Sequence, residues 1–135
     1  MSLKIIRAAL EKKLAALTPA VSISFENIAF TPTVGVPYLK VTLLPNTPDN
    51  SIMGQGSYFE RGIFQISACY PMGAGTGLAS DKVQAICGHF KRGVTMVESG
   101  VTVIVMDTPR VATAIPDGDR YCVPISMSYQ AQIIT

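Results

Sequence analysis

Apolar and polar residues alternate most regularly near the end of the chain. Apolar side chains occupy every second position there, at Ile125, Met127, Tyr129, Ala131 and Ile133. This two-residue period predicts a β-strand with one buried face. The polar residues between them form the opposite face, which contacts water or a partner protein: Ser126, Ser128, Gln130 and Gln132.

Four more segments have the composition of strands. They are residues 36–44, 58–70, 100–107 and the short 110–115. Pro45 ends the first of them, and Gly62 is predicted to mark a bulge in the second. The segment 116–119, PDGD, predicts the turn before the last strand.

A helical period appears in two segments. In residues 3–17 the apolar side chains recur every three or four positions, at Leu3, Ile6, Leu10, Leu14 and Leu17, and Thr18-Pro19 ends the pattern. In residues 80–90 the shared face consists of Val83, Ile86, Cys87 and Phe90. Ser80 or Thr76 is expected to cap the start of this helix, and Gly93 its end.

The order of these segments predicts an α+β fold in one domain, residues 1–135. We expect two helices packed on one face of a largely antiparallel sheet of four to five strands. Residues 45–56 have no period and are rich in Pro, Asn, Asp and Gly, so they predict a long exposed loop.

Composition narrows the possible functions. Apolar residues make up 48% of the chain and charged residues 15%, which favours a surface that contacts partners. A net charge of +2 does not indicate binding to nucleic acid or to a membrane, because such sites need clustered Lys and Arg. No segment approaches the roughly 20 apolar residues of a transmembrane helix. Arg7 and Glu11 interrupt any signal-peptide core, so we expect a mature protein that is soluble.

The cysteines and the single histidine do not form a recognisable site. Cys69, Cys87 and Cys122 are odd in number and lack C-x-x-C spacing, so we expect buried free thiols and a reducing compartment. Cys87 and His89 lie two apart on a helix and point to different sides, which disfavours a zinc site and a catalytic pair. A pair of His89 with Cys69 or Cys122 stays open. With no acidic cluster either, we expect no enzyme, no metal and no cofactor.

The glycines between the second long strand and the second helix raise the question of nucleotide binding. Residues 70–77, YPMGAGTG, lack the lysine of a Walker loop, since Leu78 follows Gly77. They also lack the third glycine of a dinucleotide loop, and the nearest acidic candidate, Glu98, lies in a turn-like segment. A flexible strand-to-helix connection is therefore favoured.

Several segments together resemble the tail terminators of long-tailed phages and prophages, similar to the lambda tail terminator. They are SFENIAFTP (24–32), PYLKVTLLP (37–45), RGIFQISACYPMGAGTG (61–77), HFKRG (89–93) and DGDRYCVPISMSYQA (117–131). The residues that resemble the family are Glu26, Asn27, Arg61, Gly62, Gly75, Gly77, Arg92 and Gly93.

This resemblance implies a ring of subunits, usually a hexamer, at the head-proximal end of the tail tube. Such a ring stops tube polymerisation and presents a surface to the neck of the head. The implied partners are other copies of the chain, the tail tube protein and a head-tail connector or neck protein, without direct recognition of nucleic acid or membrane. The implied location is the virion tail, assembled in the cytoplasm of a bacterial host.

A head-to-tail ring needs two different complementary patches on each subunit. The expected interface residues come from the loop, the glycine-rich segments and the polar face of the last strand: Asn46, Asp49, Asn50, Arg61, Gly75, Gly77, Arg92, Ser126, Ser128 and Gln130. Two alternatives remain at this point. One is another adaptor of the head-tail junction, and the other is a nucleotide-binding enzyme that uses residues 73–77.

Overall fold

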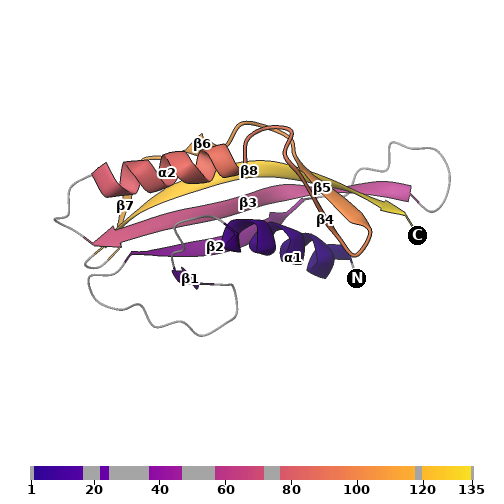
Figure 1. Ribbon diagram of the computed structural model, residues 1–135, viewed down its shortest axis with the longest axis horizontal. Helices are drawn as coiled ribbons and strands as arrows, with labels where there is room; N and C mark the ends of the chain where they lie inside the picture. The colour runs from indigo at the N-terminus through magenta and orange to yellow at the C-terminus, as the bar shows by residue number, and fades with distance from the viewer. Residues whose placement is uncertain are drawn as a thin grey trace.

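The computed structural model describes residues 2–16, 22–24, 37–46, 57–71, 77–117 and 120–134. Every segment predicted to be a helix or strand contains one (Figure 1). The elements in chain order are α1 (Ser2–Ala15), β1 (Ser22–Ser24), β2 (Tyr38–Pro45), β3 (Ser57–Pro71), α2 (Gly77–His89), β4 (Thr95–Glu98), β5 (Val101–Val105), β6 (Arg110–Val111), β7 (Ile115–Asp117) and β8 (Arg120–Ile134).

The strands form one eight-stranded sheet in the order β1-β2-β3-β8-β5-β4, with β6 and β7 also paired to β8. The pair β1–β2 is parallel and the others are antiparallel. The α+β class is confirmed, but the expected four to five strands and their simple antiparallel arrangement were wrong. The additional strands, β1, β4 and β7, are three or four residues long, too short to show a period in the sequence.

Two long strands, β3 and β8, form the centre of the sheet. Each has 15 residues, and they pair without interruption from Ser57↔Ile134 to Pro71↔Arg120. The predicted alternation of β8 is confirmed, since its five apolar residues from Ile125 to Ile133 are all buried. The pairing therefore divides the sheet into an inner face, which carries the core, and an outer face.

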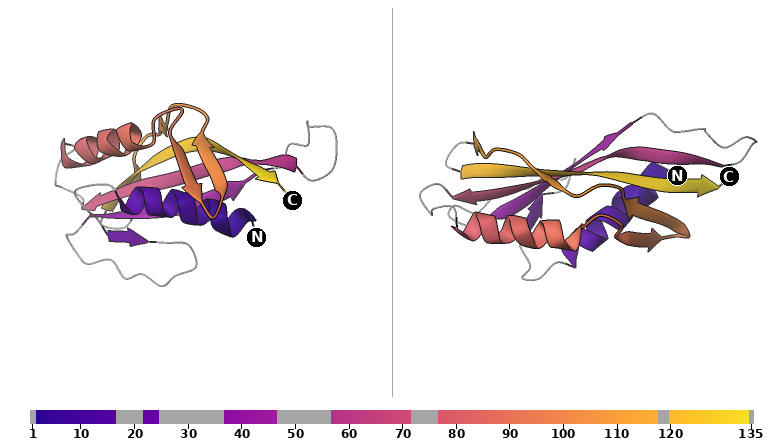
Figure 2. Two further views of the ribbon diagram at one scale, coloured as in Figure 1. Left: turned by 45° about the vertical axis from the view of Figure 1, so that its right-hand side comes forward. Right: turned by 90° about the horizontal axis from the view of Figure 1, so that it is seen from above.

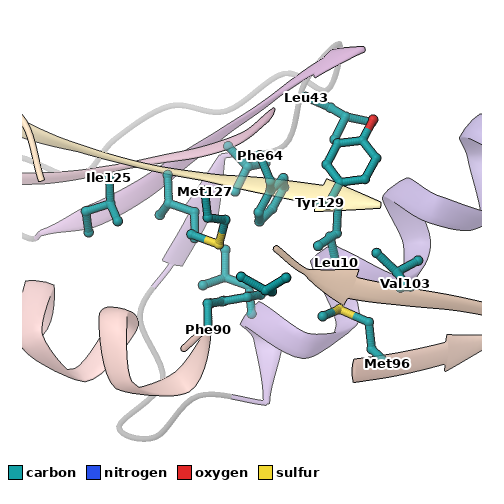
Figure 3. Packing of buried hydrophobic residues seen from close by; sticks show 14 of the residues in the cluster. Leu10, Leu43, Phe64, Phe90, Met96, Val103, Ile125, Met127 and Tyr129 are labelled. Carbon is teal, nitrogen blue, oxygen red and sulfur yellow. The ribbon is translucent and has the colours of Figure 1, made fainter. Parts of the chain in front are cut away.

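Both helices cover the inner face (Figure 2). Ile6, Leu10 and Leu14 of α1 and Ile86 of α2 belong to one buried cluster with the inner residues of β2, β3 and β8. In Figure 3, Phe90, which directly follows α2, points toward Phe64 and Met127 of the sheet. The ring centroids of Phe64 and Phe90 are 6.0 Å apart, within the range of favourable aromatic contacts. The predicted apolar stripes are thus the surfaces that dock the helices.

The ends of α2 and the next strand differ from the prediction. The helix begins at Gly77, so Ser80 lies within it and is not a cap, while Thr76 lies outside the described residues. Gly93 has the expected left-handed backbone, with φ 89°, but α2 already ends at His89. Glu98, which was assigned to a turn, ends strand β4, and its carboxylate lies 2.7 Å from the Lys12 ammonium of α1.

Gly62 does not mark a bulge, because the pairing of β3 with β8 runs through it without a break. It permits a close approach instead. A Cβ atom at this position would lie 2.6 Å from the Leu44 carbonyl oxygen and 2.6 Å from the Tyr129 hydroxyl. The glycine is therefore required because the ring of Tyr129 lies directly over the strand.

The prediction of three free thiols was wrong, because Cys69 and Cys122 form a disulfide. They are direct cross-strand partners in the β3–β8 pair, although they are 53 residues apart in sequence. Cys87 is the remaining free cysteine. The disulfide leaves neither Cys69 nor Cys122 to pair with His89 as a catalytic thiol, and it removes the basis for expecting a reducing compartment.

Candidate assembly surface

The outer face of the sheet carries an exposed apolar patch. Six large apolar residues are exposed in the part of the chain that the structure describes. Three of them line one groove of about 520 Å³ on this face, and we call Leu44, Ile63 and Met106 the outer patch. Leu44 and Ile63 are cross-strand partners, and Met106 donates its backbone N–H to the Ser128 carbonyl at 2.8 Å. Adjacent strands therefore hold the three side chains together.

Polar groups surround the outer patch on both sides. Arg61 Nε donates a hydrogen bond to Gln130 Oε1 at 3.0 Å, and the backbone N–H of Asn46 donates to the Arg61 carbonyl at 2.9 Å. On the other side, Asp107 accepts two hydrogen bonds from Ser128, from its N–H at 2.9 Å and its hydroxyl at 3.1 Å. An apolar centre with a polar rim is the usual composition of a protein–protein interface.

The fold brings together half of the residues expected at an interface. Asn46, Arg61, Ser128 and Gln130 line the groove of the outer patch, and Ser126 lies next to it on the same face. Arg92 lies in the turn after α2, and Gly77 is the first residue of that helix, so neither lines this groove. Asp49, Asn50 and Gly75 lie outside the described residues, as do Glu26 and Asn27.

The outer patch itself and Asp107 were not predicted from the sequence. Ile63 lies on the polar side of its strand, between Arg61 and Gln65. An apolar residue at such a position was the feature of the sequence that could have indicated the outer patch. Met106 was included in the predicted strand 100–107, but β5 ends at Val105, so Met106 lies just beyond the observed strand. Only the pairing of β2, β3, β8 and β5 places these residues side by side.

A second apolar groove lies on the helical side, between α2 and the last part of the chain. It has a volume of about 380 Å³, and we call it the α2 groove. Val83 and Cys87 of α2 form one wall, and Val111, Tyr121 and Val123 form the other. Burial raises the pKa of the Cys87 thiol, as expected for a sulfur atom in apolar surroundings.

The described residues contain no cluster of three or more His, Cys, Asp or Glu side chains that could hold a metal ion. His89, the single histidine, contacts the Lys13 backbone carbonyl at the end of α1. Within the described part of the chain, neither helix has the length and apolar character needed to cross a membrane. Residues 72–76, most of the glycine-rich segment, lie outside the described residues.

An α+β fold with three exposed apolar side chains grouped on the outer face of its sheet has the features of a subunit that assembles with other proteins. Comparison with protein families specifies the class. Residues 5–129 match the family described as phage tail terminator protein. The chain belongs to this family, and it is a structural protein of a phage tail.

Solved structures agree with this assignment of the fold. One chain, whose name states no function, is 28% identical, with a TM-score of 0.78 over 100% of this chain and 99% of that chain. Another comes from the virion of a native gene transfer agent particle and is 18% identical, with a TM-score of 0.58 over 98% of this chain and 97% of that chain. No curated protein sequence is significantly similar to the chain.

Proposed function

We propose that the protein forms a closed ring of identical subunits, a hexamer, at the head-proximal end of the tail tube. There it stops tube polymerisation and presents the surface to which the head is joined. The membership of the tail terminator family over residues 5–129 supports this role. The implied partners are the tail tube protein and a neck or connector protein, and assembly takes place in the cytoplasm of the bacterial host.

The outer patch is the observation that carries the proposal. Leu44, Ile63 and Met106 are 45%, 40% and 42% exposed, and they lie together in one groove. Covering such a patch removes apolar area from water, which stabilises association by roughly 25 cal/mol for each Å² buried. A subunit that is surrounded by neighbours in a particle explains why these side chains are exposed in the isolated chain.

The test measures both assembly and tube capping. The solution mass is determined by light scattering, and negative-stain images are recorded of tail tubes grown with and without the protein. We expect ring-shaped particles and tubes that stop growing when the protein is present. Ile63→Asp should abolish both effects, since it places a charge in the outer patch. Val97→Asp is the matched control, because Val97 is 66% exposed on β4, away from the outer patch.

Two results would contradict the proposal. Tubes that continue to grow at saturating protein would exclude a terminator. Binding to the portal-side ring without binding to tube ends would assign the protein to the other adaptors of the head-tail junction.

A further inference from the structure

We propose that the α2 groove of one subunit receives the outer patch of the next subunit. This inference rests on the proposed ring and names the two surfaces that close it. A ring with cyclic symmetry is a head-to-tail assembly, which uses two different complementary patches on each subunit. The described surface offers two apolar grooves, one containing the outer patch and the other the α2 groove.

The two surfaces cannot cover each other within one chain. The side chains of Leu44 and Ile63 lie on the outer face of the sheet and point outward. The α2 groove lies on the inner side of the sheet, next to α2. They are also at different positions along β8, near Ser128 for the outer patch and near Tyr121 for the groove. We therefore assign the groove to a second copy of the chain.

The chemistry of the two surfaces favours this pairing. The outer patch presents three large, partly exposed apolar side chains, and the α2 groove has a volume of about 380 Å³. Its walls are mostly apolar, with Val83, Val111 and Val123 beside the ring of Tyr121. Val111 is 48% exposed, so the groove is open in the isolated subunit. Insertion of the patch would bury apolar side chains on both sides of the contact.

The charges at the two surfaces are opposite in sum, because two arginines outnumber Asp107 at the outer patch whereas α2 presents an acidic residue beside its groove. Arg61 and Arg110 are exposed on the outer face, on opposite sides of Ile63. Asp81 is the exposed charged residue of α2, and it directly follows Ser80, which lines the groove. Lys82, the other charged residue in the first half of α2, is buried. Opposite charges at the rims of two apolar surfaces favour a fixed mutual orientation.

The experiment uses one variant of each surface. Val111→Asp blocks the groove and leaves the outer patch intact, while Met106→Asp blocks the patch and leaves the groove intact. Both side chains are partly exposed, so the subunits should fold. Sedimentation velocity should show that each variant alone has lost the large oligomer. An equal mixture should form a heterodimer and nothing larger. The patch of the Val111→Asp subunit fills the groove of the Met106→Asp subunit, and the two surfaces that remain in the pair are both blocked.

The thiol of Cys87 reports occupation of the groove directly. It lines the α2 groove and is the free cysteine of the chain. Its alkylation rate in Met106→Asp should fall by about tenfold when a partner with Val111→Asp and Cys87→Ser is added, because docking covers the thiol. The control is a partner that carries Met106→Asp with Cys87→Ser, which lacks an intact patch and should leave the rate unchanged.

The outcomes separate this inference from the proposed function. If Val111→Asp assembles like the wild type, or if the mixture stays monomeric with Cys87 unprotected, the proposed docking is wrong. This holds even if rings still cap tubes, in which case the function stands. If the heterodimer forms but the wild type does not cap tubes, the docking stands and the function does not. A wild type that stays monomeric with Cys87 equally reactive, with and without tubes, overturns both.

Discussion

Replacing Gly62 by alanine tests how closely the sheet is packed at its centre. The added Cβ would lie 2.6 Å from the Leu44 carbonyl oxygen, 2.6 Å from the Tyr129 hydroxyl and 2.8 Å from Cε2 of the same ring. Ordinary contact begins at 3.4 Å. The Leu44 oxygen belongs to the backbone of β2, and Tyr129 is only 1% exposed, so neither can move away freely.

The magnitude follows from two opposing effects. Overpacking of a filled core typically costs about 1–3 kcal/mol. Replacing glycine by alanine at a position that tolerates it stabilises by roughly 0.5–1 kcal/mol, because the unfolded chain loses freedom. A Cβ at position 62 would clash with two separate groups, so we expect the cost of overpacking to exceed the stabilisation that comes from the less flexible unfolded chain. The free energy of unfolding should therefore fall by about 1–2 kcal/mol.

Urea denaturation followed by circular dichroism measures this change. Gly88→Ala is the matched control, because Gly88 lies in α2 and a Cβ there would meet nothing within 4 Å. That variant should be more stable by about 0.5–1 kcal/mol. If Gly62→Ala were as stable as the wild type, the close approach of Tyr129 to β3 would not exist in solution and the reasoning would fail.

Three further predictions concern buried polar groups and the disulfide. The Tyr129 hydroxyl is buried without a hydrogen-bond partner in the described structure, so Tyr129→Phe should leave stability unchanged or raise it by up to about 1 kcal/mol in urea denaturation. Burial and the nearby Glu60 carboxylate raise the pKa of Tyr129 above 10.0, so the folded state keeps this proton longer than the unfolded state. The wild type should therefore lose stability faster than the Phe variant as the pH rises through 10, and parallel profiles would contradict this. Reduction of the Cys69–Cys122 disulfide should lower the free energy of unfolding by about 2–4 kcal/mol, and equal urea midpoints with and without reductant would exclude the bond. Asp107→Ala should lower the free energy of unfolding by about 1–2 kcal/mol, because it removes both oxygens that accept hydrogen bonds from Ser128. Asp107→Asn retains one acceptor oxygen and should lower the free energy of unfolding by less.

The sequence predicted the elements whose pattern repeats over several turns or strand positions. The alternation in β8 matches the buried residues of the structure, as do Ile6, Leu10 and Leu14 of the α1 stripe and Ile86 and Phe90 of the second helical face. Val83 and Cys87 of that face are partly buried, and the side chains of Leu3 and Leu17 lie outside the described residues. These patterns are local, since a side chain's direction follows from its neighbours in the same helix or strand. Ser128 and Gln130 were also predicted correctly as residues of the polar face of the last strand, and the resemblance to tail terminators was confirmed by the family match.

What the sequence could not determine is which strands are neighbours. The short strands β1, β4 and β7 form because neighbouring strands offer them hydrogen bonds, not because their own sequences are periodic. The disulfide was missed for the same reason, as Cys69 and Cys122 meet only through the register of β3 with β8. Gly62 looked like a bulge until the pairing placed Tyr129 over it.

The surfaces for assembly depend on both the sequence and the tertiary structure. The order of residues is sufficient to give each long element one apolar and one polar side, because hydrophobic burial acts on every segment separately. In contrast, Leu44, Ile63 and Met106 meet in one groove, and α2 leaves another beside Val111, only in the folded chain. Those contacts join residues far apart in the chain, and only the packing of the whole sheet brings them together.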